Sequence, residues 1–164
     1  MKAYIGVDNG VSGSIAMILG DRVLFAPTPT RSEQSYTKAK ANITRIDVPE
    51  LISRFQSWLI GSTTARAFVE RPYVNPQGFK ATVSAVRSLE ATLICLETVN
   101  ISYQYIDSKQ WQRELLPKGC VGAELKHASL DIGIRLFPTL REELEDHKDA
   151  DSLLIAEWAR RNNL

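Results

Sequence analysis

The chain has 164 residues, 44% of them hydrophobic and 24% charged, which is typical of one soluble globular domain spanning residues 1–164. No apolar run approaches the roughly 20 residues of a membrane helix, and the first ten residues have a strand pattern rather than that of a signal peptide. The two cysteines, Cys95 and Cys120, argue against a disulfide scaffold or a CxxC zinc site, so we expect free thiols in a cytoplasmic protein, or in host-cell cytoplasm if the origin is a phage.

The net charge of +1 is unevenly distributed along the chain. Residues 142–151 hold six acids and one lysine, a sum of −5, so the rest of the chain sums to +6. An acidic focus in a basic background suits a metal-dependent enzyme that acts on a polyanion. A solvated acidic helix start is the alternative interpretation.

Three short apolar runs separated by tight turns predict an antiparallel meander of strands at residues 3–9, 14–19 and 22–26. Residues 27–46 are polar, begin with two closely spaced prolines, and carry Lys38, Lys40 and Arg45. We therefore expect a basic loop or mobile segment there.

Helices and strands then alternate. Asp47 is the expected N-cap of the first helix, and Glu70 ends the fourth strand. The predicted elements are helix 47–60, strand 65–70, helix 79–98, strand 101–106, and helices 108–116, 123–136 and 149–161. This order predicts an α/β fold with a five-stranded mixed sheet, three strands antiparallel and two parallel, and helices on both faces.

Asp8 and Glu70 each follow an apolar strand, so neighbouring parallel strands would bring both carboxylates to one edge of the sheet. Two carboxylates held close together raise each other's pKa, which is costly unless a cation lies between them. A hard divalent ion such as Mg²⁺ takes oxygen ligands. Taken singly, Asp8 can be a turn former and Glu70 an exposed strand end.

Asp151 precedes the last apolar helix and is the third candidate acid. His147 lies four residues earlier and shares a helix face with Asp151 if that helix starts early. Asp149 would then point to another side, or act as an N-cap. We rank His147 first as the fourth site residue, with Asp149 and Asp146 left open and a surface histidine as the alternative.

Three stretches of the chain resemble RuvC-type Holliday junction resolvases of the ribonuclease H-like superfamily: YIGVDNGVSGSIA, AFVERPYVNPQGFKATVSAVRSLEATL and HKDADSLLIAEWARR. The segment DSKQWQRELLPKGCVGAELKHASLDIGIRLFP is similar to the matching part of smaller phage-type relatives. The family has acids at the positions of Asp8, Glu70 and Asp151. It often has a carboxylate or His three residues before the last Asp, where this chain has Lys148, with His147 one position earlier.

The resemblance implies a ribonuclease H-like fold and a Mg²⁺-dependent endonuclease, with Mn²⁺ as a substitute, that resolves four-way DNA junctions by paired phosphodiester hydrolysis. It implies two metal ions about 3.5–4 Å apart, bridged by Asp8 and completed by Glu70 and Asp151. His147 would orient or deprotonate the water, or assist one metal. Lys126 matches one of two family lysines and is a candidate for stabilising phosphate charge, while Gln112 holds the place of the other.

Arg71, Tyr73, Phe79 and Lys80 follow Glu70 directly and are the candidate contacts to branched DNA, with Tyr73 and Phe79 as stacking residues. Core packing of Phe79 is the alternative. Surface cations elsewhere, including Lys38 and Lys40, are further candidates for phosphate contact, each of which ordinary surface charge explains equally well.

A symmetric junction with two cuts suits a two-fold homodimer, for which helix 79–98 is a candidate interface. The competing functions are a nuclease for flaps, other branched DNA or RNA hybrids, an actin-like nucleotide-binding domain, and a junction binder without catalysis. The actin-like class shares the opening strand–Asp–Gly turn but duplicates the fold, for which this chain is short.

Overall fold

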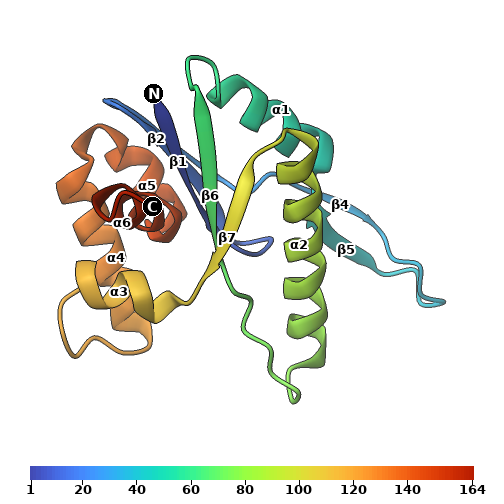
Figure 1. Ribbon diagram of the computed structural model, residues 1–164. Coiled ribbons are helices and arrows are strands. Elements are labelled where there is room, and N and C mark those ends of the chain that lie inside the picture. The colour runs from blue at the N-terminus through green and yellow to red at the C-terminus, as the bar shows by residue number, and fades with distance from the viewer.

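A five-stranded sheet forms the centre of the computed structural model, which describes residues 1–164 (Figure 1). The strand order is β3-β2-β1-β6-β7. β1 and β3 pair antiparallel with β2, whereas β1, β6 and β7 run parallel. The strands are β1 (Lys2–Asp8), β2 (Ser14–Leu19), β3 (Arg22–Pro27), β6 (Thr64–Glu70) and β7 (Ser102–Ile106). The predicted fold class is therefore confirmed.

Helices cover both faces of this sheet, as Figure 1 shows. One layer consists of α1 (Val48–Trp58) and α2 (Phe79–Thr98). The other consists of α3 (Ser108–Leu115), α4 (Ala123–Leu136), the short 3-10 helix η1 (Pro138–Leu140), α5 (Arg141–His147) and α6 (Asp151–Arg161). None of the helices combines the length and apolar composition that crossing a membrane would require.

The side chains of β1 alternate between two hydrophobic cores because successive residues of a strand point to opposite faces. Ala3, Ile5 and Val7 are buried in the core beneath α1 and α2. The intervening positions, Tyr4 and Gly6, face the α6 layer, where Tyr4 packs against the second core. Burial on both faces explains why β1 and β2 are almost continuously apolar.

Gly6 lets α6 lie directly on the centre of the sheet. A Cβ atom at this position would lie 1.8 Å from the backbone oxygen of Ser152. The Ser14 hydroxyl donates a hydrogen bond to the Ser152 hydroxyl at 2.7 Å. This contact holds the first turn of α6 beside the ends of β1 and β2.

The predicted loop at residues 27–46 is wrong. The chain forms a hairpin there, made of β4 (Thr30–Gln34) and β5 (Asn42–Ile46), which pair as a separate two-stranded sheet. The prolines at 27 and 29 precede the hairpin instead of interrupting it. Ile43 and Ile46 supply the only apolar strand positions, and only Ile46 is buried, so the alternation typical of a strand is weak.

The C-terminal boundary also differs from the prediction. α6 begins at Asp151 instead of residue 149, and the unpredicted α5 precedes it. Lys148 separates the two helices with a left-handed backbone, φ 75°. This interruption between α5 and α6 determines which acidic side chains can lie close to Asp151.

Candidate active site

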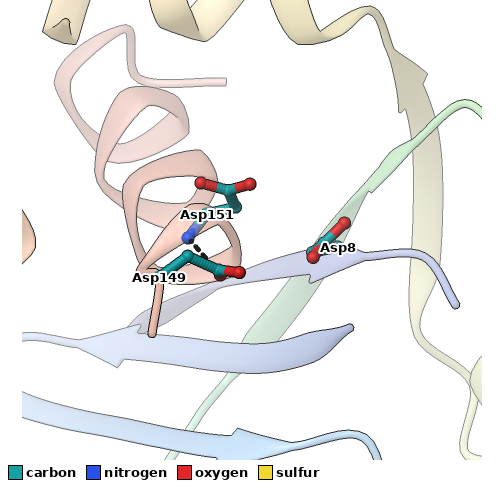
Figure 2. Close-up of side chains that lie close together, drawn as sticks. All are labelled: Asp8, Asp149 and Asp151. Carbon is teal, nitrogen blue, oxygen red and sulfur yellow. Dashed lines mark hydrogen bonds between the residues drawn. The ribbon is translucent and has the colours of Figure 1, made fainter. Parts of the chain in front are cut away.

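Three carboxylates meet at one edge of the sheet (Figure 2). Oxygen atoms of Asp8, Asp149 and Asp151 all lie within 4.8 Å of one another. Asp8 ends β1, Asp151 is the first residue of α6, and Asp149 lies in the link between α5 and α6. The cluster thus joins two segments that are more than 140 residues apart in the sequence.

Strand alternation explains why Asp8 faces α6. It is two residues beyond Gly6, which packs on α6, so its side chain leaves the sheet on the same face. The chain then turns sharply back, and a Cβ atom at Gly13 would lie 2.1 Å from the Asp8 carbonyl oxygen. The small residues after Asp8 therefore let the chain fold over the end of its own strand.

Glu70 lies at the same edge, on the neighbouring strand. β6 runs parallel to β1 with Val69 opposite Val7, and Glu70 follows immediately. It shares a face with Phe68, which is buried in the α6-side core. Glu70 stands outside the group of three within 4.8 Å, yet it lies close enough for its charge to raise the pKa of Asp8.

The link before α6 is held by hydrogen bonds that orient two of the acids. The backbone N–H of Asp151 donates to the Asp149 carboxylate at 3.3 Å. The Ser129 hydroxyl, on α4, donates to Asp151 and accepts from the backbone N–H of Ala150 at 3.1 Å. Gly133 allows α4 to approach this link, because a Cβ there would lie 2.3 Å from the Ala150 Cβ.

The electrostatics of the cluster are unfavourable for bare carboxylates. Burial, followed by the charges of Asp151 and Glu70, raises the pKa of Asp8 well above its usual value. Burial and the charge of Asp151 raise the pKa of Glu70 to about 7. Burial and the charge of Asp149 raise the pKa of Asp151 to about 6. Each group resists ionisation, so a cation at this edge would be stabilising.

Lys126 provides one positive charge at the cluster. Its Nζ donates to Asp149 Oδ2 at 2.6 Å, while its side chain stays 61% exposed and the Asp149 side chain only 5%. Burial alone would lower the pKa of Lys126, but the hydrogen bond to Asp149 raises it above its usual value. Lys126 therefore remains a cation at the rim of the site.

His147 lies behind the cluster and not within it. The expected shared helix face with Asp151 is wrong, because the left-handed Lys148 ends α5 directly after His147. The His147 Nε2 is 3.5 Å from an oxygen of Asp149, and the ring packs edge-on against Phe25, 5.4 Å between centroids. Burial lowers the pKa of His147, against the opposing charge of Asp149.

Asp149 takes the place in the cluster that was expected for His147. The sequence offers one signal for it, the interpretation of Asp149 as an N-cap, but the N-cap of α6 is Ala150 and Asp149 lies one residue before it. Asp146, the remaining open candidate, is exposed on α5. The sequence alone does not indicate that the chain turns at Lys148 and carries the Asp149 carboxylate inward.

The candidate DNA contacts lie beyond Glu70, on exposed positions. Tyr73 is 82% and Phe79 75% exposed, so the alternative of core packing for Phe79 is wrong. Lys80 is also exposed at the start of α2. Arg71 forms an exposed ion pair with Asp107 at 3.6 Å.

The donor set fits a hard divalent cation. It consists of carboxylate oxygens, which Mg²⁺ and Mn²⁺ prefer to nitrogen or sulfur. The raised pKa values of Asp8 and Asp151 show that these carboxylates are short of positive charge. Asp8, Asp149 and Asp151 are placed to share an ion, and Glu70 stands at the same edge.

No protein-family model and no curated protein matches this chain. Among solved structures, T. thermophilus RuvC in complex with a Holliday junction substrate is 11% identical, and the match covers 99% of this chain and 96% of that one at a TM-score of 0.54. A second Thermus thermophilus RuvC structure is 13% identical over 98% and 96% of the two chains, at a TM-score of 0.48. The first match, together with the mixed sheet, shows that this chain has the ribonuclease H-like fold of RuvC.

Proposed function

We propose that residues 1–164 form a single nuclease domain, a divalent-metal-dependent endonuclease that hydrolyses phosphodiester bonds in branched DNA, with the four-way junction as its main substrate. The observation that carries this proposal is the convergence of Asp8, Asp149 and Asp151 beside Glu70, at one edge of a RuvC-like sheet. A DNA substrate also suits a cytoplasmic setting.

In this proposal Asp8 is the central ligand, because it lies on the middle strand and its charge couples to those of Asp151 and Glu70. The four acids are enough to divide between two Mg²⁺ ions, with Mn²⁺ as a substitute. Bound metal would polarise the scissile phosphate and lower the pKa of a water molecule. Neutralising the acids' mutual repulsion would stabilise the folded protein at the same time.

The chain's own side chains then orient the site. His147 lies behind the cluster with its Nε2 3.5 Å from Asp149, so we assign it to positioning Asp149 instead of to deprotonating water. Lys126 holds Asp149 from the other side and presents its exposed Nζ to the incoming phosphate. Ser129 fixes the rotamer of Asp151.

Branched DNA would be held by the segment after Glu70. Tyr73 and Phe79 are exposed aromatic rings beside the acidic edge, which suits stacking on bases unpaired at a branch. Arg71 and Lys80 supply positive charge there. A homodimer would place two sites for paired cuts, and α2 leaves Val86 and Ile94 nearly half exposed on its surface.

The test is a Mg²⁺-dependent cleavage assay on four-way, flap, linear duplex and RNA–DNA hybrid substrates. Wild type should cut the four-way junction fastest, and Asp8→Asn should bind it but cut at least ~10²-fold more slowly. Asp21→Asn is the matched control, since Asp21 is exposed in the turn at the opposite end of the sheet.

If wild type cut flaps faster than four-way junctions, the nuclease assignment would stand and the proposed substrate would change. Wild type that binds junctions without cutting them at any metal concentration would make the chain a binder only. An actin-like nucleotide site would show as ATP binding in calorimetry, and the close contact of Gly13 with the Asp8 carbonyl leaves little room for a phosphate within the turn.

A further inference from the structure

The β4–β5 hairpin, residues 30–46, is called the basic arm below. Only its last residue, Ile46, is buried in the core beneath α1 and α2, and Figure 1 shows the rest of the hairpin reaching outward past α2. Its strands pair only with each other, from Thr30 opposite Ile46 to Gln34 opposite Asn42. A two-stranded ribbon adds little stability by itself, so the outer half of the arm has no evident role in the core.

The basic arm concentrates positive charge. It contains four cations, Arg31, Lys38, Lys40 and Arg45, and one acid, Glu33, a net charge of +3. Because the whole chain has a net charge of +1, the remainder sums to −2. Residues 142–151 alone sum to −5, so the arm carries three of the six net positive charges found outside them and is a local concentration of charge that can attract a polyanion.

Two of these cations face each other across the hairpin. Arg31 is directly opposite Arg45, an arrangement that is destabilising for like charges. Both form ion pairs with the single carboxylate of Glu33, and the nearby charge of Arg87, on α2, also lowers the pKa of that carboxylate. Two arginines thus share one acid, with Arg87 nearby as a third cation, and these three arginines are called the arginine cluster.

The arginine cluster borders a hollow between β5 and α2. This cavity has a volume of about 260 Å³, and Arg45 and Arg87 both line it, together with the hydroxyls of Thr44, Ser84 and Ser88. Guanidinium and hydroxyl groups are donors that suit phosphate oxygens. One acid, Glu90, also lines the cavity and limits its charge.

The side chains of the lysines at the tip of the arm form no ion pairs. Lys38 and Lys40 are exposed and take part in no ion pair, and no acid lies between residues 34 and 46. Tyr36, at the same tip, is 94% exposed. Unpaired exposed lysines beside an exposed aromatic ring are typical of a surface that contacts nucleic acid.

The arm starts near the acidic edge and leads away from it. Asp8 pairs with Ser14, and Ser14 with Pro27, so two strand spacings put Pro27, three residues before the arm begins, about 10 Å from Asp8. Strands of five residues then span about 17 Å. That reach equals roughly five base pairs of B-DNA at about 3.4 Å each.

We propose that the basic arm binds the phosphate backbone of a DNA duplex several base pairs from the cleaved bond, with Lys38 and Lys40 at its tip and the arginine cluster at its base. This inference rests on the proposed function and adds a second contact surface to it. A second copy of the chain is the less favoured occupant, because two arms of net charge +3 would repel each other.

The experiment measures binding of a fluorescently labelled four-way junction by anisotropy, in an Asp8→Asn background that need not cut. Lys38→Gln with Lys40→Gln should raise the Kd about tenfold near 0.1 M salt, and lower the slope of log affinity against log salt by about two between roughly 50 and 200 mM. Arg135→Gln with Arg141→Gln, exposed positions on α4 and at the start of α5, is the matched control and should change neither.

A second variant replaces residues 35–41 with Asn-Gly, a two-residue turn that keeps the pairing of Gln34 with Asn42. It should weaken binding at least as much as the lysine pair, with the same loss of slope. Normal affinity and slope in both variants would overturn the arm proposal. A shift from dimer to monomer in ultracentrifugation with an unchanged slope would also overturn it, by assigning the arm to contact between copies.

The outcomes separate the two proposals. If the arm variants lose affinity but wild type never cuts, the arm stands and the nuclease assignment fails. If wild type cuts junctions and the arm variants bind as wild type does, the nuclease stands and the arm fails. If the chain binds no DNA at all, both fail.

Discussion

The acidic edge and the basic arm place opposite charges in opposite environments. The carboxylates of Asp8, Asp149 and Asp151 are largely removed from water and fixed by neighbouring elements. The lysines of the arm are exposed at the tip of a hairpin that is separate from the central sheet. Buried like charges cost free energy until a cation joins them, whereas exposed cations cost little and keep their full hydration until a partner arrives.

This contrast assigns different measurable properties to the two regions. The acidic edge should govern the rate of cleavage, its metal requirement and its pH dependence. The exposed surfaces should govern affinity and salt dependence. A variant of the acidic edge that changed the salt dependence of binding, or a variant of the exposed surfaces that changed the metal requirement of cleavage, would contradict this division.

The largest expected effect comes from Asp149. We expect Asp149→Asn to slow cleavage by on the order of 10²–10³-fold, because it removes a buried charge at the reacting centre, while junction affinity stays within about twofold. The measurement is single-turnover cleavage at saturating Mg²⁺. Asp146→Asn, an exposed acid on α5, is the control.

His147→Gln sharpens the same comparison. As a positioning residue it should raise the Mg²⁺ concentration for half-maximal rate by about 10-fold, with most of the rate recovered at saturating Mg²⁺. The opposite outcome would be a cleavage rate of His147→Gln that stays low at saturating Mg²⁺, together with near-normal cleavage by Asp149→Asn. That outcome would show that His147, and not Asp149, takes part in catalysis.

A smaller effect is expected at the exposed aromatic residues. Tyr73→Ala and Phe79→Ala should each weaken junction binding about tenfold, because base stacking contributes about 1–3 kcal/mol per base. The salt slope should not change, since neither ring carries charge. Because both side chains are exposed, the free energy of unfolding should stay within about 0.5 kcal/mol of wild type.

Linear duplex of the same length is the control for these two variants. An equal loss of affinity for duplex and junction would show that the rings do not recognise the branch. A changed salt slope would place them in the electrostatic class with the basic arm.

The smallest effect is on stability. The pKa values of Glu70 and Asp151 are raised in the folded protein to about 7 and about 6, so the folded state binds more protons than the unfolded state between about pH 4 and pH 7. The contribution of these two groups to the free energy of unfolding in metal-free buffer should therefore be greatest near pH 4. It should fall as the pH rises through 7. Thermal unfolding measured across this range checks the sign.

Mg²⁺ should reverse this loss. At ten times its Kd, Mg²⁺ should raise the Tm at pH 8 by about 3–6 °C, and Asp8→Asn should remove most of that rise. A metal-free protein whose stability increases from pH 5 to pH 8 would show that these acids do not repel one another in the folded state.

Much of the sheet could be predicted from the sequence, because short apolar runs ending in Asp8 and Glu70 already indicate buried strands. Strand alternation and parallel pairing then determine that both side chains face α6. Predictions of this kind succeed where local pattern and burial agree.

The hairpin and the α5–α6 link could not be predicted in the same way. β4 and β5 are mostly polar, so their strand pattern is weak. Lys148 adopts a left-handed backbone although it is not glycine. The residues after it are held by α4, where Gly133 lies against Ala150 and Lys126 holds Asp149, and such contacts join residues 17 to 23 positions apart.

The packing of α6 on Gly6 has a consequence for synthesis on the ribosome. Asp8 and Glu70 emerge first, but the proposed metal site lacks its other two acids until residues 149–151 have left the exit tunnel and α6 has docked on Gly6 and Ser14. A nascent chain interrupted before this point carries the basic arm without an assembled acidic cluster. Under the proposed function, translation order therefore delays cleavage until α6 has been synthesised and has folded onto the sheet.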